Sequence, residues 1–151
     1  MVREFLKSFG ADDMIRTEDV VQIKEFYFTV NRLQKELLRH TRPVFVGYCL
    51  GKKKGNFFCP SVCLLDFVSG RYEKKIVVDA KTEWLFICGR DIFNVQEVLG
   101  NPQDNDLVLV LNRFKECIGI AQYTAVPNKK NPIKHVYDIG DYLRRERKRK
   151  M

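Results

Sequence analysis

Two short apolar runs separated by a polar turn constrain the fold of this chain more than any other feature. Residues 107–111 (Leu-Val-Leu-Val-Leu) and residues 117–121 (Cys-Ile-Gly-Ile-Ala) are joined by the segment 113–116, which is mostly polar. Short apolar runs bounded by turn residues are typical of buried strands, and a short connection lets two strands pair side by side. The two runs therefore predict a β-hairpin.

Further elements are predicted on both sides of this hairpin. Residues 75–79 and 135–137 predict strands, and residues 80–88 have the composition of a helix. Gly89 follows that helix at the position where a chain commonly turns left-handed. A last helix is predicted over residues 139–149, with the preceding aspartate as its N-cap.

The first half of the chain predicts a second set of elements. Extended segments are predicted at residues 26–30, 44–50 and 57–65. Leucines at helical spacing predict a helix over residues 32–40, with the asparagine before it as the N-cap. The lysine-rich segment 52–56 is predicted to be the turn between two strands.

Composition excludes several classes of protein. A hydrophobic fraction of 45% and an aromatic fraction of 12% are enough for a core, which excludes wholesale disorder. There is no run of 18 uncharged apolar residues and no apolar leader, so neither a membrane span nor a secretory signal is expected. Five cysteines without a Cys-x-x-Cys pair argue against a disulfide framework and against a zinc site. We therefore expect buried thiols, no cofactor and a cytoplasmic location.

The positive charge is unevenly distributed. The net charge of +8 divides into +5 over residues 1–75, −2 over residues 76–143 and +5 over residues 144–151. A dense positive segment suits a polyanion, because each neutralised phosphate releases condensed counterions. The alternative is a solvated tail without a ligand. Charge alone therefore leaves nucleic acid and solvent as equal candidates.

Several segments resemble a known RNA-binding module and one family that contains it. Residues 75–79 and 83–92 resemble the opening strand, helix and glycine of a PUA domain, the module named for pseudouridine synthases and archaeosine transglycosylases. Residues 136–145 resemble the end of a family of PUA-containing ribosome-biogenesis proteins known as nuclear import protein seven. Three segments are similar to the N-terminal domain of that family: residues 28–33, 47–52 and 63–67.

The resemblance implies an architecture and a function. We expect an α+β fold with a small α/β domain at residues 1–73 and a PUA pseudo-barrel of mixed strands at residues 75–151. The start of the chain is shorter than in eukaryotic members and is more similar to an archaeal member. The implied function is binding of ribosomal RNA precursor during large-subunit assembly, without catalysis, by a monomer that works with ribosome-assembly proteins. The implied location is cytoplasmic, or nucleolar and nuclear if the source is eukaryotic.

The candidate RNA-binding residues are basic clusters, together with the glycine that follows the helix at residues 80–88. Arginine forks fit phosphate oxygens, whereas lysine acts as a point charge. Each cluster also has a structural interpretation, as a solvated turn or, for the glycine, as a helix stop. The predicted residues are Arg144, Arg145, Arg147, Lys148 and Arg149 in the tail, Gly89 and Arg90 after the helix, and Lys52, Lys53, Lys54, Lys129 and Lys130 in two lysine clusters.

Aromatic side chains are expected in the core rather than at a ligand. An aromatic ring near a basic segment stacks on unpaired RNA bases in many complexes, and Tyr142 is close to the tail in sequence. The family resemblance nevertheless implies that Tyr142 lies on a packed helix face. The aromatic residues predicted in the core are Phe26, Phe28, Phe45, Phe57, Phe58 and Trp84.

Two other classes of function stay open. A small RNA-modifying or hydrolytic enzyme on a PUA-like barrel needs a pocket with a titratable pair, for which Asp66, Asp79 and Lys81 are the first candidates. A protein-interaction adaptor would use the N-terminal domain, and RNA would be incidental. The sequence has no nucleophile elbow, phosphate-binding glycine loop or His-Glu-x-x-His motif, so no catalytic residues and no metal ligands are predicted.

Overall fold

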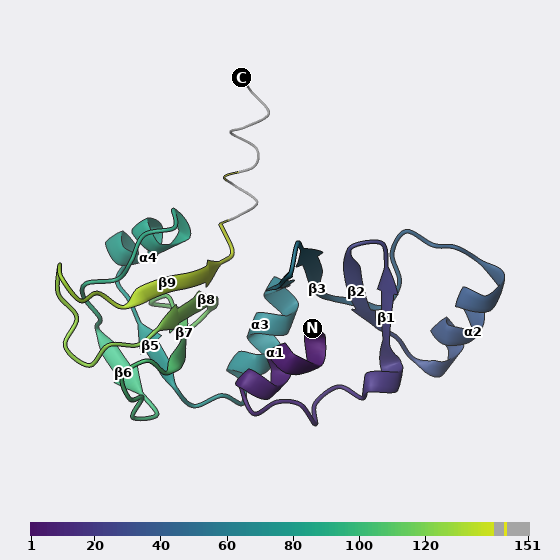
Figure 1. Cartoon of the computed structure of the whole chain (residues 1–151), viewed down its shortest axis with the longest axis horizontal. Coiled ribbons are helices and arrows are strands. Elements are labelled where there is room, and N and C mark those ends of the chain that lie inside the picture. The colour runs from purple at the N-terminus through teal and green to yellow at the C-terminus, as the bar shows by residue number, and fades with distance from the viewer. Residues whose placement is uncertain (141–143, 145–151) are drawn as a thin grey trace, which may run out of the picture. The chain divides into compact units, whose positions relative to one another are not determined.

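The computed structural model of the protein divides into two units (Figure 1). It describes residues 1–140 and residue 144. One unit comprises Met1–Arg71 and the other Tyr72–Met151. Each unit contains helices and a sheet, which confirms the α+β class. The predicted division into domains at residues 1–73 and 75–151 stays a prediction.

Four antiparallel strands form the sheet of the N-terminal unit in the order β1-β2-β3-β4. The strands are β1 (Val20–Ile23), β2 (Phe26–Thr29), β3 (Tyr48–Lys54) and β4 (Phe57–Pro60). Strand β3 starts later than predicted and includes the lysines at residues 52–54, so the turn predicted at 52–56 was wrong in extent. The turn itself is Gly55 and Asn56, and Gly55 takes a φ of 60° that glycine adopts without steric cost.

Three α-helices accompany this sheet: α1 (Val2–Ser8), α2 (Arg32–His40) and α3 (Val62–Ser69), with a short 3-10 helix at Thr17–Asp19. The predicted N-cap of α2 is confirmed. Asn31 and Gln34 form a capping box, in which each side chain accepts the other's backbone N–H at 2.9 Å. Residues 61–65 were predicted as strand, but they begin α3. The reason is that Ser61 Oγ accepts the N–H of Leu64 at 3.0 Å and so caps a helix.

One core cluster of the N-terminal unit joins β2 to α2. Phe28 and Val46 are buried together, and Leu38 of α2 packs against them. Phe45 and Phe57 were predicted in the core but are 64% and 76% exposed. Phe45 meets the buried ring of Phe28 edge-on, with centroids 4.9 Å apart, and therefore covers the core from outside.

Five strands form the mixed sheet of the C-terminal unit in the order β6-β5-β7-β8-β9. The strands are β5 (Lys75–Val77), β6 (Glu97–Leu99), β7 (Leu107–Leu111), β8 (Cys117–Gln122) and β9 (Lys134–Asp138). Strand β5 pairs in parallel with β7, and the other neighbours are antiparallel. The hairpin predicted from the two apolar runs is confirmed as β7 and β8. The short edge strand β6 was not predicted.

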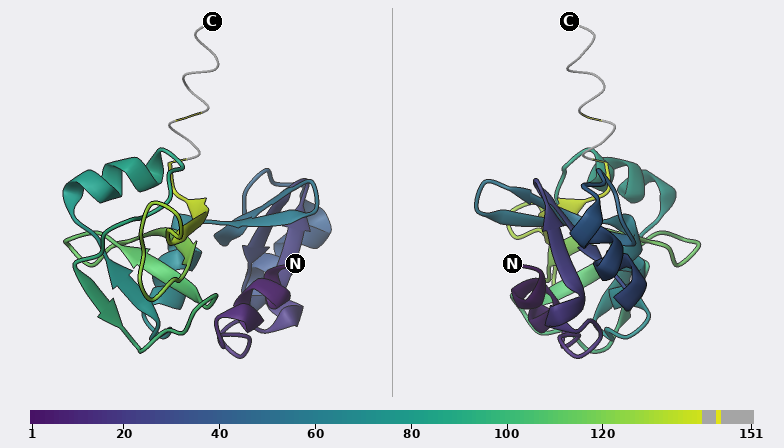
Figure 2. Two further views of the ribbon diagram at one scale, coloured as in Figure 1. Left: turned by 60° about the vertical axis from the view of Figure 1, so that its left-hand side comes forward. Right: turned by 90° about the vertical axis from the view of Figure 1, so that its right-hand side faces the viewer.

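Helix α4 (Ala80–Ile87) packs against β8 and β9 (Figure 2). Asp79 caps it, because its Oδ1 accepts the N–H of Thr82 at 2.7 Å. Phe86 is fully buried in the core cluster of this unit. Trp84 was predicted in the core but is 54% exposed. Successive helical residues are about 100° apart, so a helix that turns Phe86 inward turns Trp84 outward.

Two further expectations concern the chain as a whole. None of the helices in the described part of the chain is long and apolar enough to cross a membrane. Cys117 is buried as expected, but Cys63 and Cys88 are exposed, so the prediction of buried thiols was wrong for these two. The helix predicted over residues 139–149 falls largely outside the described residues. Within it, the N–H of Arg144 donates to Gly140 O at 3.1 Å, a helical spacing.

Candidate nucleic-acid interface

A buried carboxylate joins the end of β9 to the C-terminal end of α4. The Asp138 side chain is 0% exposed. Its oxygens accept hydrogen bonds from the Gly140 N–H at 2.6 Å and from the two terminal nitrogens of Arg144 at 2.9 and 3.0 Å. Nε2 of His135 lies 2.5 Å from the same carboxylate. Three residues therefore converge on one buried charge.

Asp138 is ionised at neutral pH even though it is buried. Burial raises the pKa of this carboxyl, because it removes the charged form from water, but the hydrogen bonds and charges of His135 and Arg144 together lower the pKa by more. The pKa of Asp138 therefore lies below its ordinary value. As a result, Arg144 meets a full negative charge, the partner for which its planar fork is suited.

Arg144 is anchored to the body of the C-terminal unit. Its guanidinium also donates to the backbone oxygen of Ile87, the last residue of α4, and its side chain is 39% exposed. Arg144 thus has a structural role that its sequence position did not indicate. That it also contacts RNA stays a prediction. The other predicted tail residues, Arg145, Arg147, Lys148 and Arg149, lie outside the described residues.

Gly89 and Arg90 lie beside this anchor, immediately after α4. The N–H of Gly89 donates to Phe86 O at 2.8 Å and the N–H of Arg90 donates to Leu85 O at 3.1 Å, a Schellman motif. Gly89 has a φ of 85°, which explains why glycine ends this helix. A Cβ on Gly89 would lie 4.0 Å from Nη1 of Arg144. The structure therefore brings together Gly89 and Arg144, two predicted residues that are distant in sequence.

The predicted lysine clusters belong to other parts of the fold. Lys129 and Lys130 are exposed in the loop between β8 and β9. Asn128 orders that loop, because its Oδ1 accepts the N–H groups of Lys130 at 2.9 Å and of Asn131 at 3.0 Å. The cluster at residues 52–54 lies on β3 of the N-terminal unit. Their contact with RNA stays a prediction.

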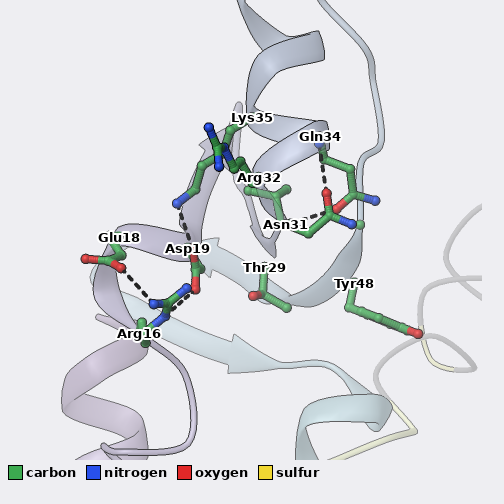
Figure 3. Close-up of a pocket in the computed structure, with 11 residues that line it drawn as sticks. Arg16, Glu18, Asp19, Thr29, Asn31, Arg32, Gln34, Lys35 and Tyr48 are labelled. Atoms are coloured by element: carbon green, nitrogen blue, oxygen red, sulfur yellow. Dashed lines mark hydrogen bonds and ion pairs between the residues drawn. The ribbon is translucent and has the colours of Figure 1, made fainter.

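The N-terminal unit contains a polar pocket of about 820 Å³ that the sequence did not predict (Figure 3). Asp19 accepts hydrogen bonds there from Lys35 at 2.7 Å and from Arg16 at 2.9 Å. These hydrogen bonds hold the pKa of Asp19 below its ordinary value. Three basic and two acidic side chains line the pocket, so much of its positive charge is neutralised internally. Its residues are far apart in sequence, which explains why no motif indicated it.

The residues considered for an enzyme are divided between two helices, α4 and α3. Asp79 is the N-cap of α4, and its hydrogen bonds to Thr82 keep the pKa of its carboxyl below the ordinary value. Lys81 is exposed on the same helix, whereas Asp66 belongs to α3 of the other unit. Among the described residues, no three His, Cys, Asp or Glu side chains are grouped as ligands for a metal ion.

Comparison with protein families identifies the C-terminal unit. Residues 74–147 match the family model described as UPF0113 PUA domain. The match covers most of this unit, just under half of the chain, and supports a PUA domain there. PUA domains are chiefly RNA-binding modules, so the match supports RNA binding. No protein of curated function matches the chain significantly.

Solved structures of archaeal proteins are similar to this chain. A conserved PUA domain protein from Thermoplasma acidophilum has a TM-score of 0.57 and 16% identity, over 96% of this chain and 91% of that chain. A hypothetical protein from Pyrococcus horikoshii has a TM-score of 0.53 and 14% identity, over 94% of this chain and 89% of that chain. A PUA domain from Aeropyrum pernix, solved with tartrate, has a TM-score of 0.46 and 18% identity, over 57% of this chain and only 54% of that chain. The first two cover both units, so the fold of the whole chain is shared.

Proposed function

We propose that this PUA-domain protein binds RNA at the edge formed by the end of α4 and the start of the basic tail, and that it catalyses no reaction. The observation that carries the proposal is the attachment of Arg144 to Asp138 and to the last residue of α4. Beyond Arg144, residues 145–151 contain five basic and one acidic side chain. A dense positive segment therefore begins at a fixed point of a PUA domain.

The mechanism is electrostatic capture followed by recognition of RNA shape. The cations of residues 145–151 neutralise phosphates and release counterions, which supplies affinity with little sequence preference. Exposed Gly89 and Arg90 border the point where the tail begins and supply additional contacts to the RNA. Lys129 and Lys130, in their exposed loop, extend the positive surface. Contacts to unpaired bases and to RNA shape then provide selectivity.

The proposed RNA is a ribosomal RNA precursor bound during large-subunit assembly. The support is the resemblance of both halves of the sequence to the ribosome-biogenesis family known as nuclear import protein seven. On this proposal the protein acts as a monomer with ribosome-assembly proteins, in the cytoplasm, or in the nucleolus if its source is eukaryotic. Its N-terminal unit, with lysines on β3, would contact further RNA or those proteins.

The decisive experiment compares the full chain with a truncation after Arg144. This truncation removes residues 145–151 and leaves the Asp138–Arg144 pair intact, so the fold is retained. Binding to a labelled single-stranded RNA is measured by anisotropy at several salt concentrations. Loss of about four phosphate contacts would reduce the log–log salt slope by about 3 and weaken binding at low salt.

Two matched controls separate charge from chain length. A tail with its five cations replaced by glutamine keeps the length and is expected to behave like the truncation. A tail with its three arginines replaced by lysine keeps the charge and is expected to keep most of the salt dependence. An unchanged affinity and slope in the truncation would show that the tail is a solvated end. Turnover of an RNA substrate by the full chain would instead favour the enzyme alternative.

The choice of RNA is tested separately by cross-linking. The intact protein is cross-linked to total cellular RNA, and both the RNA and the linked peptide are identified. We expect ribosomal RNA precursor sequences and peptides near α4 or the tail. Recovery of the same partner proteins after nuclease treatment, without enriched RNA, would support the adaptor alternative.

A further inference from the structure

The outward face of α4 displays the single tryptophan of the chain. Trp84 is 54% exposed, and its neighbour Leu85 is 41% exposed. Contiguous exposed apolar patches mark interaction surfaces more often than apolar side chains exposed singly do, and Trp84 and Leu85 adjoin each other. An indole ring also offers a flat π face, which an aliphatic side chain does not.

The composition of this helix face favours an anionic, aromatic ligand. Lys81, Trp84, Leu85 and Cys88 recur at the i, i+3, i+4 and i+7 spacing of one helical face, and all four are exposed. The one carboxylate within α4 is Glu83, and it points elsewhere, because its Oε1 accepts a hydrogen bond from the side chain of Asn112, between β7 and β8. Among the residues of α4, this face therefore carries a cation and an indole, while the N-cap carboxylate of Asp79 lies near Lys81.

This face adjoins the proposed RNA-binding edge. Arg144 donates to the oxygen of Ile87, one helical turn beyond Trp84. Exposed Gly89 and Arg90 continue the chain from the same end of the helix. An RNA strand bound at Gly89 and Arg90 would pass next to the outward face of α4.

We propose that Trp84 is a stacking platform for an unpaired base of RNA. The inference rests on the proposed function and adds to it the kind of RNA, because bases inside a duplex are already stacked and cannot reach a flat side chain. Stacking on an aromatic ring is tolerant of sequence, since every base has a π face. The ligand at this subsite is therefore single-stranded RNA. Lys81, one turn before Trp84, is positioned to contact its backbone.

The single tryptophan gives a direct measurement, since all tryptophan emission of the full-length protein comes from Trp84. The protein is titrated with a ten-nucleotide oligouridine and, separately, with an RNA duplex of the same length. We expect quenching by the single strand and little by the duplex. Affinity is measured in parallel by anisotropy of a labelled oligouridine, which does not depend on the indole.

Substitutions test whether the stacked ring contributes affinity. Trp84→Ala is expected to weaken oligouridine binding about 5- to 150-fold, the range for loss of one base-stacking contact. Trp84→Phe keeps a ring and is expected to restore most of the affinity. Phe114→Ala is the matched control, because Phe114 is a 66% exposed ring of the same unit, in the β7–β8 turn, where Arg113 covers it at 4.6 Å. Its removal is expected to leave binding unchanged.

The outcomes separate this inference from the proposed function. If the wild type binds oligouridine but Trp84 emission is unchanged and Trp84→Ala binds equally well, the stacking role is wrong and the proposed function stands. Equal losses in Trp84→Ala and Phe114→Ala also contradict it, because the effect would not be local. If emission responds to a protein partner and not to RNA, the face is a protein-docking surface. If the wild type binds no RNA at all, the proposed function fails and this inference fails with it.

Discussion

Asp19 in the N-terminal unit and Asp138 in the C-terminal unit each hold two basic side chains, but only Asp138 is removed from water. The Asp19 side chain is 19% exposed and lies in the wall of an open pocket, with Lys35 and Arg16 as its partners. The Asp138 side chain is 0% exposed. Hydrogen bonds lower the pKa of both carboxyls, so both are charged at neutral pH. The same kind of ion pair is therefore in contact with water at Asp19 and shielded from water at Asp138.

Because their burial differs, the two clusters have different roles. At Asp19 water competes with the partners, so the ion pairs add little stability and mainly set the charge of the pocket. At Asp138 an unpaired charge would be costly, so the partners must remain in place. That requirement fixes Arg144, and with it the start of the basic tail, against the end of α4. The buried cluster positions the proposed RNA-binding edge, whereas the exposed one does not.

The largest effect is expected from Asp138→Asn. The amide keeps the shape of the side chain but removes the charge that Arg144 and His135 face, and we expect a loss of about 3 kcal/mol in the free energy of unfolding. Urea unfolding followed by the emission of Trp84 measures it, because the single tryptophan reports on the C-terminal unit. A loss within error of zero would show that the buried cluster is not an anchor.

Lowering the pH is expected to have the next largest effect on stability, and the lowered pKa of Asp138 determines the direction of the change. A carboxyl whose pKa is lowered by folding stabilises the protein fully at a pH above its ordinary pKa, which is 3.8. This contribution is lost as the pH falls through the pKa of the folded state. The stability difference between the wild type and Asp138→Asn should therefore be full at pH 7 and at pH 5 and should shrink below pH 4.

Urea titrations of both proteins at pH 7, 5 and 3 provide the test. Taking the difference cancels the contributions of other carboxyls with lowered pKa values, such as Asp91 and Asp106, because these are present in both proteins. A difference that grew between pH 5 and pH 3 would mean that the Asp138 carboxyl is protonated in the folded protein, whereas growth between pH 7 and pH 5 would report on His135, which faces this carboxyl.

Arg144→Lys should have a smaller effect, because it keeps the charge and removes the fork. Lysine cannot form the paired hydrogen bonds at 2.9 and 3.0 Å. We expect a loss of about 1 kcal/mol, reduced by the partial exposure of this side chain. Urea unfolding followed by Trp84 emission measures it.

The control for Arg144→Lys is Arg71→Lys. Arg71 makes the same two-pronged contact with Asp13, at 2.9 and 3.0 Å, but both side chains are more than half exposed. If burial determines the loss in the free energy of unfolding, Arg71→Lys should lose clearly less than Arg144→Lys. Urea unfolding is followed here by circular dichroism, because the tryptophan is in the other unit. Equal losses would mean that the fork geometry matters and its burial does not.

The elements of the fold that depend on neighbouring residues were predictable from the sequence. The β7–β8 hairpin follows from two apolar runs and a turn, the start of α2 from Asn31, and the end of α4 from Gly89. The prediction was wrong at residues 61–65, where the apolar composition suits a strand and a serine cap decides for a helix. It was also wrong at Trp84, because the inward side of α4 is set by contacts with β8 and β9.

The site was less predictable than the fold. The contact between Arg144 and the oxygen of Ile87 joins residues 57 positions apart, and no local pattern encodes such a contact. The positive charge of the tail and the glycine after α4 were visible in the sequence, but the carboxylate that joins them was predicted only as a helix cap. The pocket around Asp19 depends on three separate segments and also required the structure.

The smallest effect is expected from Asp19→Asn, the exposed counterpart of Asp138→Asn. Its partners remain hydrated after the substitution, so little stability is lost, and the urea midpoint should shift by less than about a third of the shift for Asp138→Asn. Circular dichroism follows the N-terminal unit. The pocket should become more positive, since Lys35 and Arg16 lose their shared counter-charge. If Asp19→Asn destabilised its unit as much as Asp138→Asn destabilises the other, burial would not be what distinguishes the two clusters, and the anchoring role assigned to Asp138 would lose its physical basis.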